Sequence, residues 1–127
     1  MTAALLPLRV LGFAFWFALQ VVRSGSRVLR DIVTPHDESH PLVVRQPTQC
    51  RSEAEIALLA ILVSLTPGTL VLSLGEEDAP ETDGAARARV RSLFVHTMYE
   101  SLDEATADVA RLERRLLRAI RVRGRPE

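Results

Sequence analysis

Lysine is absent from this chain of 127 residues, and all sixteen of its strongly basic side chains are arginines. Sixteen acidic side chains balance them, so the formal net charge at pH 7 is +0. A neutral chain lacks the basic excess of a general nucleic-acid binder, and we expect no nucleic-acid partner. We attribute the missing lysine to codon composition rather than to mechanism.

Cysteine is nearly absent too, because Cys50 stands alone and excludes an internal disulfide. No histidine lies beside it in the sequence, so an inert thiol is expected, with a reactive thiol as the alternative. Glycine-rich nucleotide loops, Cys-x-x-Cys pairs, G-x-S-x-G and H-E-x-x-H motifs are also missing. No carboxylate interrupts the apolar runs to suggest a proton path. We therefore expect neither an enzyme, nor a cofactor, nor a self-sufficient transporter.

Aromatic residues are few, and four of the six lie between Phe13 and Phe17. They belong to an apolar segment, Leu5 to Val22, that reaches about the 18 residues a bilayer demands. Pro7 suits a first helical turn, and Arg9 can snorkel to the interface. We expect residues 1–30 to form a membrane-embedded helix that spans the bilayer or packs among other membrane helices. A cleaved signal peptide and a soluble core helix remain as alternatives.

Three arginines follow the apolar segment at helical spacing, Arg23, Arg27 and Arg30. They predict a basic, amphipathic extension of the helix on the membrane surface. By the positive-inside rule they also place the C-terminal side of the chain in the cytoplasm.

Residues 31–47 contain three prolines and predict a linker followed by a short strand from Leu42 to Val44 that ends at Pro47. The linker carries His36, Asp37, Glu38 and His40. A solvated loop is the expected state of these side chains, and a metal site is the alternative.

The stretch from Ser52 to Leu74 predicts a helix, a tight turn and a strand. Ser52 and Glu55 form a capping box before an apolar run, which predicts a helix from Glu53 to Leu65. Such a helix, with almost no polar face, is either buried or lies against lipid or a partner. Pro67 disfavours helical angles at Thr66, and Gly68 gives the turn its backbone freedom. Thr69 to Leu74 is then strand-like.

Residues 75–91 predict a polar loop with an acidic half and a basic half that closes on itself. A second strand is expected from Ser92 to Tyr99, with Leu93, Val95 and Thr97 on one face and His96 on the other, half-exposed face. A second capping box, Ser101 to Glu104, opens an amphipathic helix from Leu102 to Ile120. Acidic residues at its start and arginines at its end match the helix dipole, and the basic end could also touch anionic lipid.

The order β, α, β, β, α predicts an α/β (α+β) sandwich with both helices on one face of a small sheet. We expect the strand from Leu42 to pair in parallel with Thr69–Leu74, and Thr69–Leu74 to pair antiparallel with Ser92–Tyr99. The remainder of the domain covers residues 48–123, and residues 124–127 form a tail.

The run EIALLAILVSLTPGTLVLSL resembles the signature of the E-type subunit of the multisubunit Na+/H+ antiporters of the Mrp/Mnh type. That family shows a short apolar helix, then L-T-P-G-T-L, then a strand. LFVHTMY resembles its next strand, and Leu102 to Ile120 its last helix, so the resemblance covers about residues 11–120. The matching positions, all expected to be structural, are Thr66, Pro67, Gly68, Thr69, Leu70 and His96.

The resemblance implies an accessory subunit of a plasma-membrane complex that exchanges Na+ or other monovalent cations for protons. Its partners would be the other membrane subunits and the lipid bilayer, and those subunits would handle the ions. Family members usually carry more hydrophobic sequence at the N-terminus, so this chain is either a short form or truncated at its start. The alternative function is a membrane-tethered interaction or regulatory domain unrelated to transport.

Overall fold

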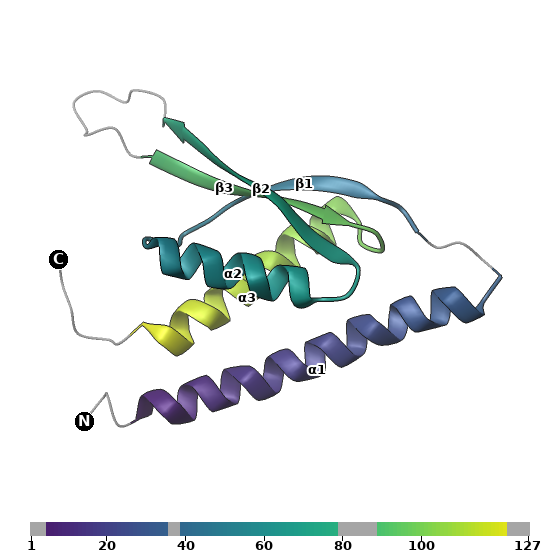
Figure 1. Cartoon of the computed structure of the whole chain (residues 1–127), viewed down its shortest axis with the longest axis horizontal. Helices are drawn as coiled ribbons and strands as arrows, with labels where there is room; N and C mark the ends of the chain where they lie inside the picture. The colour runs from purple at the N-terminus through teal and green to yellow at the C-terminus, as the bar shows by residue number, and fades with distance from the viewer. Residues whose placement is uncertain (1–4, 36–38, 79–88, 122–127) are drawn as a thin grey trace.

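The structure is a computed structural model that describes residues 5–35, 39–78 and 89–121. A three-stranded sheet forms the upper layer in Figure 1, two helices lie beneath it, and the long N-terminal helix lies beneath these. The elements in chain order are α1 (Leu6–Val33), β1 (Leu42–Pro47), α2 (Glu53–Leu65), β2 (Thr69–Asp78), β3 (Arg89–Thr97) and α3 (Leu102–Ile120). The predicted α+β class, with both later helices on one face of the sheet, is confirmed.

Both predicted capping boxes are present, and the helices start where they predict. The Ser52 hydroxyl accepts a hydrogen bond from the backbone N–H of Glu55 at 3.2 Å, and Glu55 accepts one from the N–H of Ser52 at 3.5 Å. Ser101 and Glu104 repeat the arrangement at 3.4 and 3.1 Å. Each box satisfies N–H groups that the first helical turn leaves without partners. The helices then run over Glu53–Leu65 and Leu102–Ile120, as predicted.

The predicted strand order was wrong. β1 and β2 do not pair with each other, because β3 lies between them in the order β1-β3-β2 and is antiparallel to both. β1 and β2 still run in the same direction, as a helical crossover requires, but one strand apart. The central strand then hydrogen-bonds along both edges, while the two outer strands keep one free edge each.

The hairpin of β2 and β3 is also longer than predicted, since pairing continues to Glu76 opposite Arg91 and Asp78 opposite Arg89. The acidic and basic ends of the predicted loop therefore face each other within the sheet. Arg91 Nε lies 3.1 Å from a carboxylate oxygen of Glu76. A register shift between Val71 and Ser73 marks a bulge in β2. Such a bulge bends an outer strand and increases its twist.

The core lies between the sheet and the two helices beneath it. β3 contributes Leu93 and Val95, both 1% exposed, on the face predicted for them. The helices contribute buried side chains at spacings of three and four residues: Ile56, Leu59, Leu62 and Val63 from α2, and Val109, Leu112, Leu116 and Leu117 from α3. Burial of each such side chain contributes about 1.5–3 kcal/mol to the stability of the fold, so this cluster is a main source of the stability of the domain.

Candidate interaction surface

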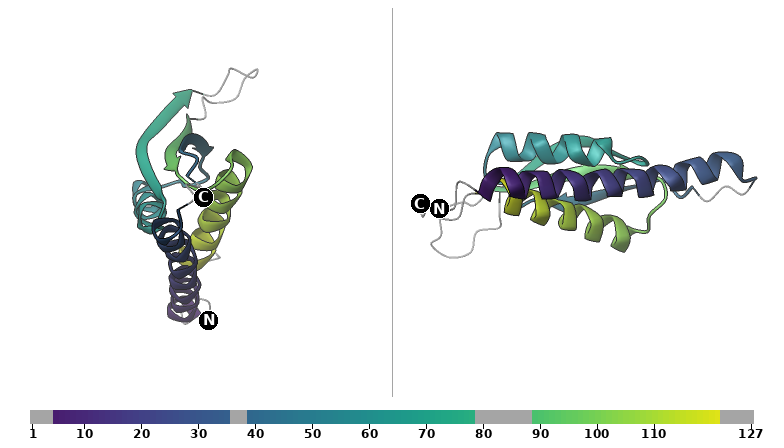
Figure 2. Two further views of the ribbon diagram at one scale, coloured as in Figure 1. Left: turned by 90° about the vertical axis from the view of Figure 1, so that its right-hand side faces the viewer. Right: turned by 90° about the horizontal axis from the view of Figure 1, so that it is seen from below.

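Helix α1 lies against the domain rather than apart from it. Seen from below in the right panel of Figure 2, it runs between α2 and α3. Phe13, Trp16 and Phe17 are partly buried and pack against the core cluster. The ring of Phe13 is 6.1 Å from that of Trp16 and 6.2 Å from that of Phe17. These aromatic side chains of the first segment therefore attach α1 to the domain.

Polar contacts hold α1 to the domain near both of its ends. Arg9 Nη1 donates a hydrogen bond to the backbone carbonyl of Arg121 at 3.4 Å. Tyr99 donates its hydroxyl to a carboxylate oxygen of Asp31 at 3.1 Å. Arg27 lies 3.9 Å from the carboxylate of Glu100. These contacts fix the rotation of α1 as well as its position.

The T-P-G-T turn connects α2 to β2 and also touches α1. Gly68 has φ +89°, a conformation that L side chains rarely adopt, and a Cβ there would lie 2.9 Å from Tyr99 Cδ2. Glycine is required at this position for both reasons. The helix passes the turn at Gly25, where an added Cβ would lie 3.8 Å from Pro67 Cγ.

The two threonines of this turn bind backbone groups. Thr66 donates its hydroxyl to the carbonyl of Leu62 at 3.1 Å, and Thr69 donates to the carbonyls of Val63 and Thr66 at 2.6 and 2.9 Å. Among the contacts the structure describes for them, both hydroxyls serve to close the helix.

The other two motif residues lie on the sheet. Leu70 pairs with His96, and His96 pairs on its other side with Val43. Leu70 is 50% exposed and His96 is half-buried, on the face turned away from the helices. His96 therefore occupies the half-exposed sheet face expected for it.

A small cavity between α1 and the domain brings two carboxyl groups together. Its lining includes Trp16, Gln20, Thr66, Glu100 and Asp108. Burial raises the pKa of Glu100 above its ordinary value, the neighbouring Asp108 raises the pKa further, and Arg27 opposes both effects. The proximity of Asp108 therefore disfavours the ionised form of Glu100.

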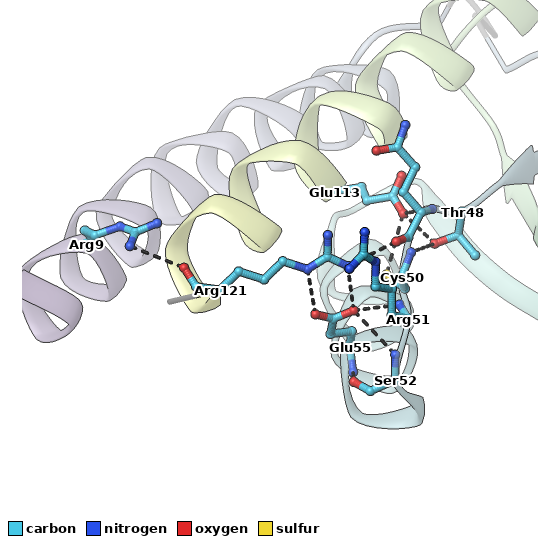
Figure 3. A network of polar contacts seen from close by, with 9 residues as sticks. Arg9, Thr48, Cys50, Arg51, Ser52, Glu55, Glu113 and Arg121 are labelled. Carbon is cyan, nitrogen blue, oxygen red and sulfur yellow. Dashed lines mark hydrogen bonds and ion pairs between the residues drawn. The ribbon is translucent and has the colours of Figure 1, made fainter. Parts of the chain in front are cut away.

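The buried carboxylate of Glu113, on α3, accepts hydrogen bonds from the loop between β1 and α2 (Figure 3). It accepts hydrogen bonds from the Thr48 hydroxyl, from the backbone N–H of Gln49 at 2.6 Å and from the Cys50 thiol at 3.5 Å. These three donors compensate for the burial of the carboxylate, which is 4% exposed. The apolar periodicity of α3 does not reveal this group, although Glu113 follows Val109 by one helical turn and lies next to Leu112 on the predicted apolar face.

The Cys50 thiol within this network is buried, and its surroundings disfavour the thiolate. Burial is the main reason that the pKa of Cys50 rises from 9.0 to about 11, and Glu113 adds to the effect. At neutral pH the thiol stays protonated and is a poor nucleophile or metal ligand.

At the end of α3, Arg121 joins three segments of the chain. Its Nε and one Nη each donate to the Glu55 carboxylate at 2.9 Å, and the same Nη donates to the carbonyl of Gln49 at 3.1 Å. The guanidinium of Arg121 is the main cause that lowers the pKa of Glu55 from 4.5 to about 2. Because Arg9 binds the Arg121 carbonyl, this fork connects α1, α2 and α3 (Figure 3).

The described residues give no support to the alternative of a metal site in the linker. Within residues 5–35, 39–78 and 89–121, no group of three His, Cys, Asp or Glu side chains is placed to hold an ion. His36, Asp37 and Glu38 lie outside the described residues.

Two apolar surfaces face outward. On α2 and β2, Ile61 and Leu65 are 56% and 58% exposed and Leu72 of β2 is 53% exposed. The helix α2 is therefore buried on one side only, and its exposed apolar side leaves room for lipid or a partner, the alternative that its sequence leaves open. On α1, the side turned away from the domain carries Leu8, Leu11, Phe15, Leu19, Val22, Leu29, Ile32 and Val33. By length and composition alone, α1 is the one described helix that could cross a membrane. The molecule thus offers two outward apolar surfaces, one on α2 and β2 and one on α1.

Comparison with known proteins identifies the family of the chain. A sequence model of the MNHE family, described as "Na+/H+ ion antiporter subunit", matches residues 1–119. The chain belongs to this family. The resemblance of the T-P-G-T-L turn to the E-type subunit of the Mrp/Mnh antiporters is thereby confirmed.

Individual MNHE relatives agree. The E-type subunit of the Na(+)/H(+) antiporter of Alkalihalophilus pseudofirmus is 23% identical over 95 residues, which are 75% of this chain and 60% of that protein. The E1-type subunit of the Na(+)/H(+) antiporter of Staphylococcus saprophyticus is 30% identical over 61 residues, 48% of this chain and 38% of that protein. The chain thus spans 60% or less of the length of these curated relatives.

A chain of the solved Mrp complex from Dietzia sp. DQ12-45-1b has the same fold. It is 40% identical to this MNHE member, with a TM-score of 0.61, and the match covers 91% of this chain and 98% of that one. The α+β domain and its N-terminal helix therefore have a counterpart inside a solved complex.

Proposed function

We propose that the chain is an accessory subunit of a multisubunit complex in the plasma membrane that exchanges Na+ or another monovalent cation for protons. The observation that carries this proposal is the 40% identity to a chain of the Mrp complex from Dietzia, in a match that covers 98% of that chain and 91% of this one. A match this complete assigns the whole described fold, and not one motif, to a subunit of such an assembly.

The contribution of the chain is to assembly, and it catalyses no reaction and needs no cofactor. Its motif residues support this role, because Thr66 and Thr69 bind backbone carbonyls and Gly68 shapes a turn. Its buried carboxylate Glu113 is held by three donors of the chain itself. The transported ions are then handled by the other membrane subunits, which are its partners together with the lipid bilayer.

The chain divides into a membrane-embedded helix with a basic extension, residues 1–30, a linker with the first strand, residues 31–47, the rest of an α+β domain, residues 48–123, and a tail, residues 124–127. The domain lies in the cytoplasm. Arg23, Arg27 and Arg30 support this side, because arginines close to an apolar segment stay on the cytoplasmic face. A reporter that is active only in the cytoplasm, fused after Glu127, should be active, and activity of an exported reporter alone would contradict this topology.

Purification from membranes tests the proposal. The chain, tagged at its C-terminus and solubilised in mild detergent, should bring down large polytopic antiporter subunits. A matched tag on an unrelated membrane protein of the same cells is the control. Recovery without any other antiporter component would favour the second candidate, a membrane-tethered regulatory domain.

A further inference from the structure

The arginines of α1 all lie on one side of the helix. At about 100° per residue, Arg9, Arg23, Arg27 and Arg30 fall within a wedge of about 60°. The eight outward apolar side chains form a separate stripe about 140° wide, from Ile32 to Leu19, centred near Val22. The arginine wedge therefore borders the stripe along one flank only, which is the composition of a helix that lies at a membrane surface.

The flank with the arginines faces α3. Trp16 lies on that flank, and the Arg115 guanidinium of α3 stacks 4.4 Å from the centre of its ring. An open cleft between the two helices is lined by Arg9, Gly12, Phe13, Arg115, Arg118 and Ala119. No carboxylate belongs to this lining among the residues that the structure describes. Three guanidinium groups thus share one cleft with apolar walls.

The docking of α1 restricts how the helix can meet a bilayer. The contacts of Arg9 and Asp31 with the domain are about 33 Å apart along the helix axis, at about 1.5 Å per residue. The hydrocarbon layer is about 30 Å thick. If the docked helix crossed it, the attached α3 and its charged side chains would enter hydrocarbon, which is very unfavourable. A docked α1 must therefore lie along the membrane surface, although its length and composition suffice to cross.

We propose that α1, docked on the domain, lies in the plane of the cytoplasmic membrane surface with its apolar stripe facing the acyl chains, and that the cleft of Arg9, Arg115 and Arg118 binds the headgroups of anionic phospholipids. The inference deepens the proposed function and rests on its placement of the domain in the cytoplasm. Charge complementarity selects the occupant, because an apolar stripe bordered by guanidinium groups matches an anionic lipid surface.

Vesicle flotation tests the cleft. The purified full chain should float with vesicles of phosphatidylcholine and phosphatidylglycerol more strongly than with phosphatidylcholine alone, and added salt should reduce the difference. Arg115→Gln with Arg118→Gln should weaken binding to the anionic vesicles about 30-fold, from the usual attraction of each arginine near such a surface. Arg51→Gln with Arg114→Gln removes the same charge from exposed sites outside the cleft and should have a much smaller effect.

Two further readouts keep the result interpretable. Circular dichroism and the emission of Trp16 report whether the variants remain folded and α1 stays docked, and Arg115→Lys should retain most of the binding. Inorganic phosphate at the concentration of the lipid headgroups should not compete. Equal loss in both double variants, equal binding to neutral vesicles, or competition by phosphate would overturn the headgroup site.

Depth measurements test the orientation. In a Trp16→Phe background, tryptophan at Leu8, Phe15 or Leu29 should be quenched equally by lipids brominated near the headgroup. A deep Phe15 position between two shallow ends would show a crossing helix and overturn the in-plane orientation. Co-purification with antiporter subunits is measured separately, so a chain that assembles but fails these tests refutes only this inference.

Discussion

The fork between Arg121 and Glu55 allows a quantitative test of how the end of α3 stabilises the fold. Glu55 is both the third residue of α2, where it completes the capping box, and the partner of Arg121. Glu55→Gln separates these roles, because glutamine still accepts the capping hydrogen bonds but carries no charge. The variant should therefore lose the ion pair and keep the helix start.

The magnitude follows from the pKa of Glu55, which is about 2 in place of 4.5. That difference corresponds to an upper limit of about 3.5 kcal/mol, at about 1.4 kcal/mol per pH unit. The Arg121 side chain is 35% exposed, so solvent screening reduces the effect, and we expect about 1–2 kcal/mol. Because the folded pKa is depressed, this contribution is complete above about pH 4.5 and is lost as the pH falls toward 2.

The assay is urea unfolding of the detergent-solubilised chain, followed by circular dichroism at pH 6 and at successively lower pH. Glu55→Gln should lower the free energy of unfolding by about 1–2 kcal/mol at pH 6, and the difference should vanish near pH 2. A double-mutant cycle with Arg121→Met should return a coupling energy of the same size at pH 6. A pH-independent difference, or a coupling energy below about 0.3 kcal/mol, would refute the reasoning.

Three further predictions address the turn, the buried acid and the thiol. Gly68→Val should lower the free energy of unfolding by about 2 kcal/mol or more, from backbone strain and displacement of Tyr99, and urea midpoints that match the parent chain would contradict it. Glu113→Leu should cost about 2–4 kcal/mol by leaving Thr48 and a backbone N–H without an acceptor, with Glu113→Gln the milder control in the same measurement. Cys50, whose pKa is raised to about 11, should resist iodoacetamide at pH 8 in the folded chain and react in urea; mass spectrometry that finds rapid native labelling would refute its burial.

The helices could be located from sequence because their signals are local. The Ser52–Glu55 and Ser101–Glu104 boxes depend on groups three residues apart, and the structure confirms both helix starts. The strand order could not be found this way. An alternating apolar pattern specifies which face of β1 is buried but not which strand lies beside it, and β3 took the position assigned to β2.

The interaction surface was only partly predictable for a similar reason. The apolar segment and its arginines predicted a membrane-associated helix, but the docking of Phe13 and Trp16 on the core depends on contacts between residues about a hundred positions apart. The Glu113 network depends on donors that lie 63 to 65 residues away in the sequence. A carboxylate on the apolar face of the last helix was the one available sign of it.

The central claim is that the chain supports cation–proton exchange by assembly and not through an ion path of its own. The most direct measurement is Na+-dependent proton release from everted membrane vesicles that carry the parent chain or Gly68→Val, normalised to the amount of complex recovered. The account predicts that Gly68→Val lowers the total rate in proportion to the complex lost and leaves the KM for Na+ and the rate per complex unchanged. A normal amount of complex with an altered KM for Na+ would contradict it.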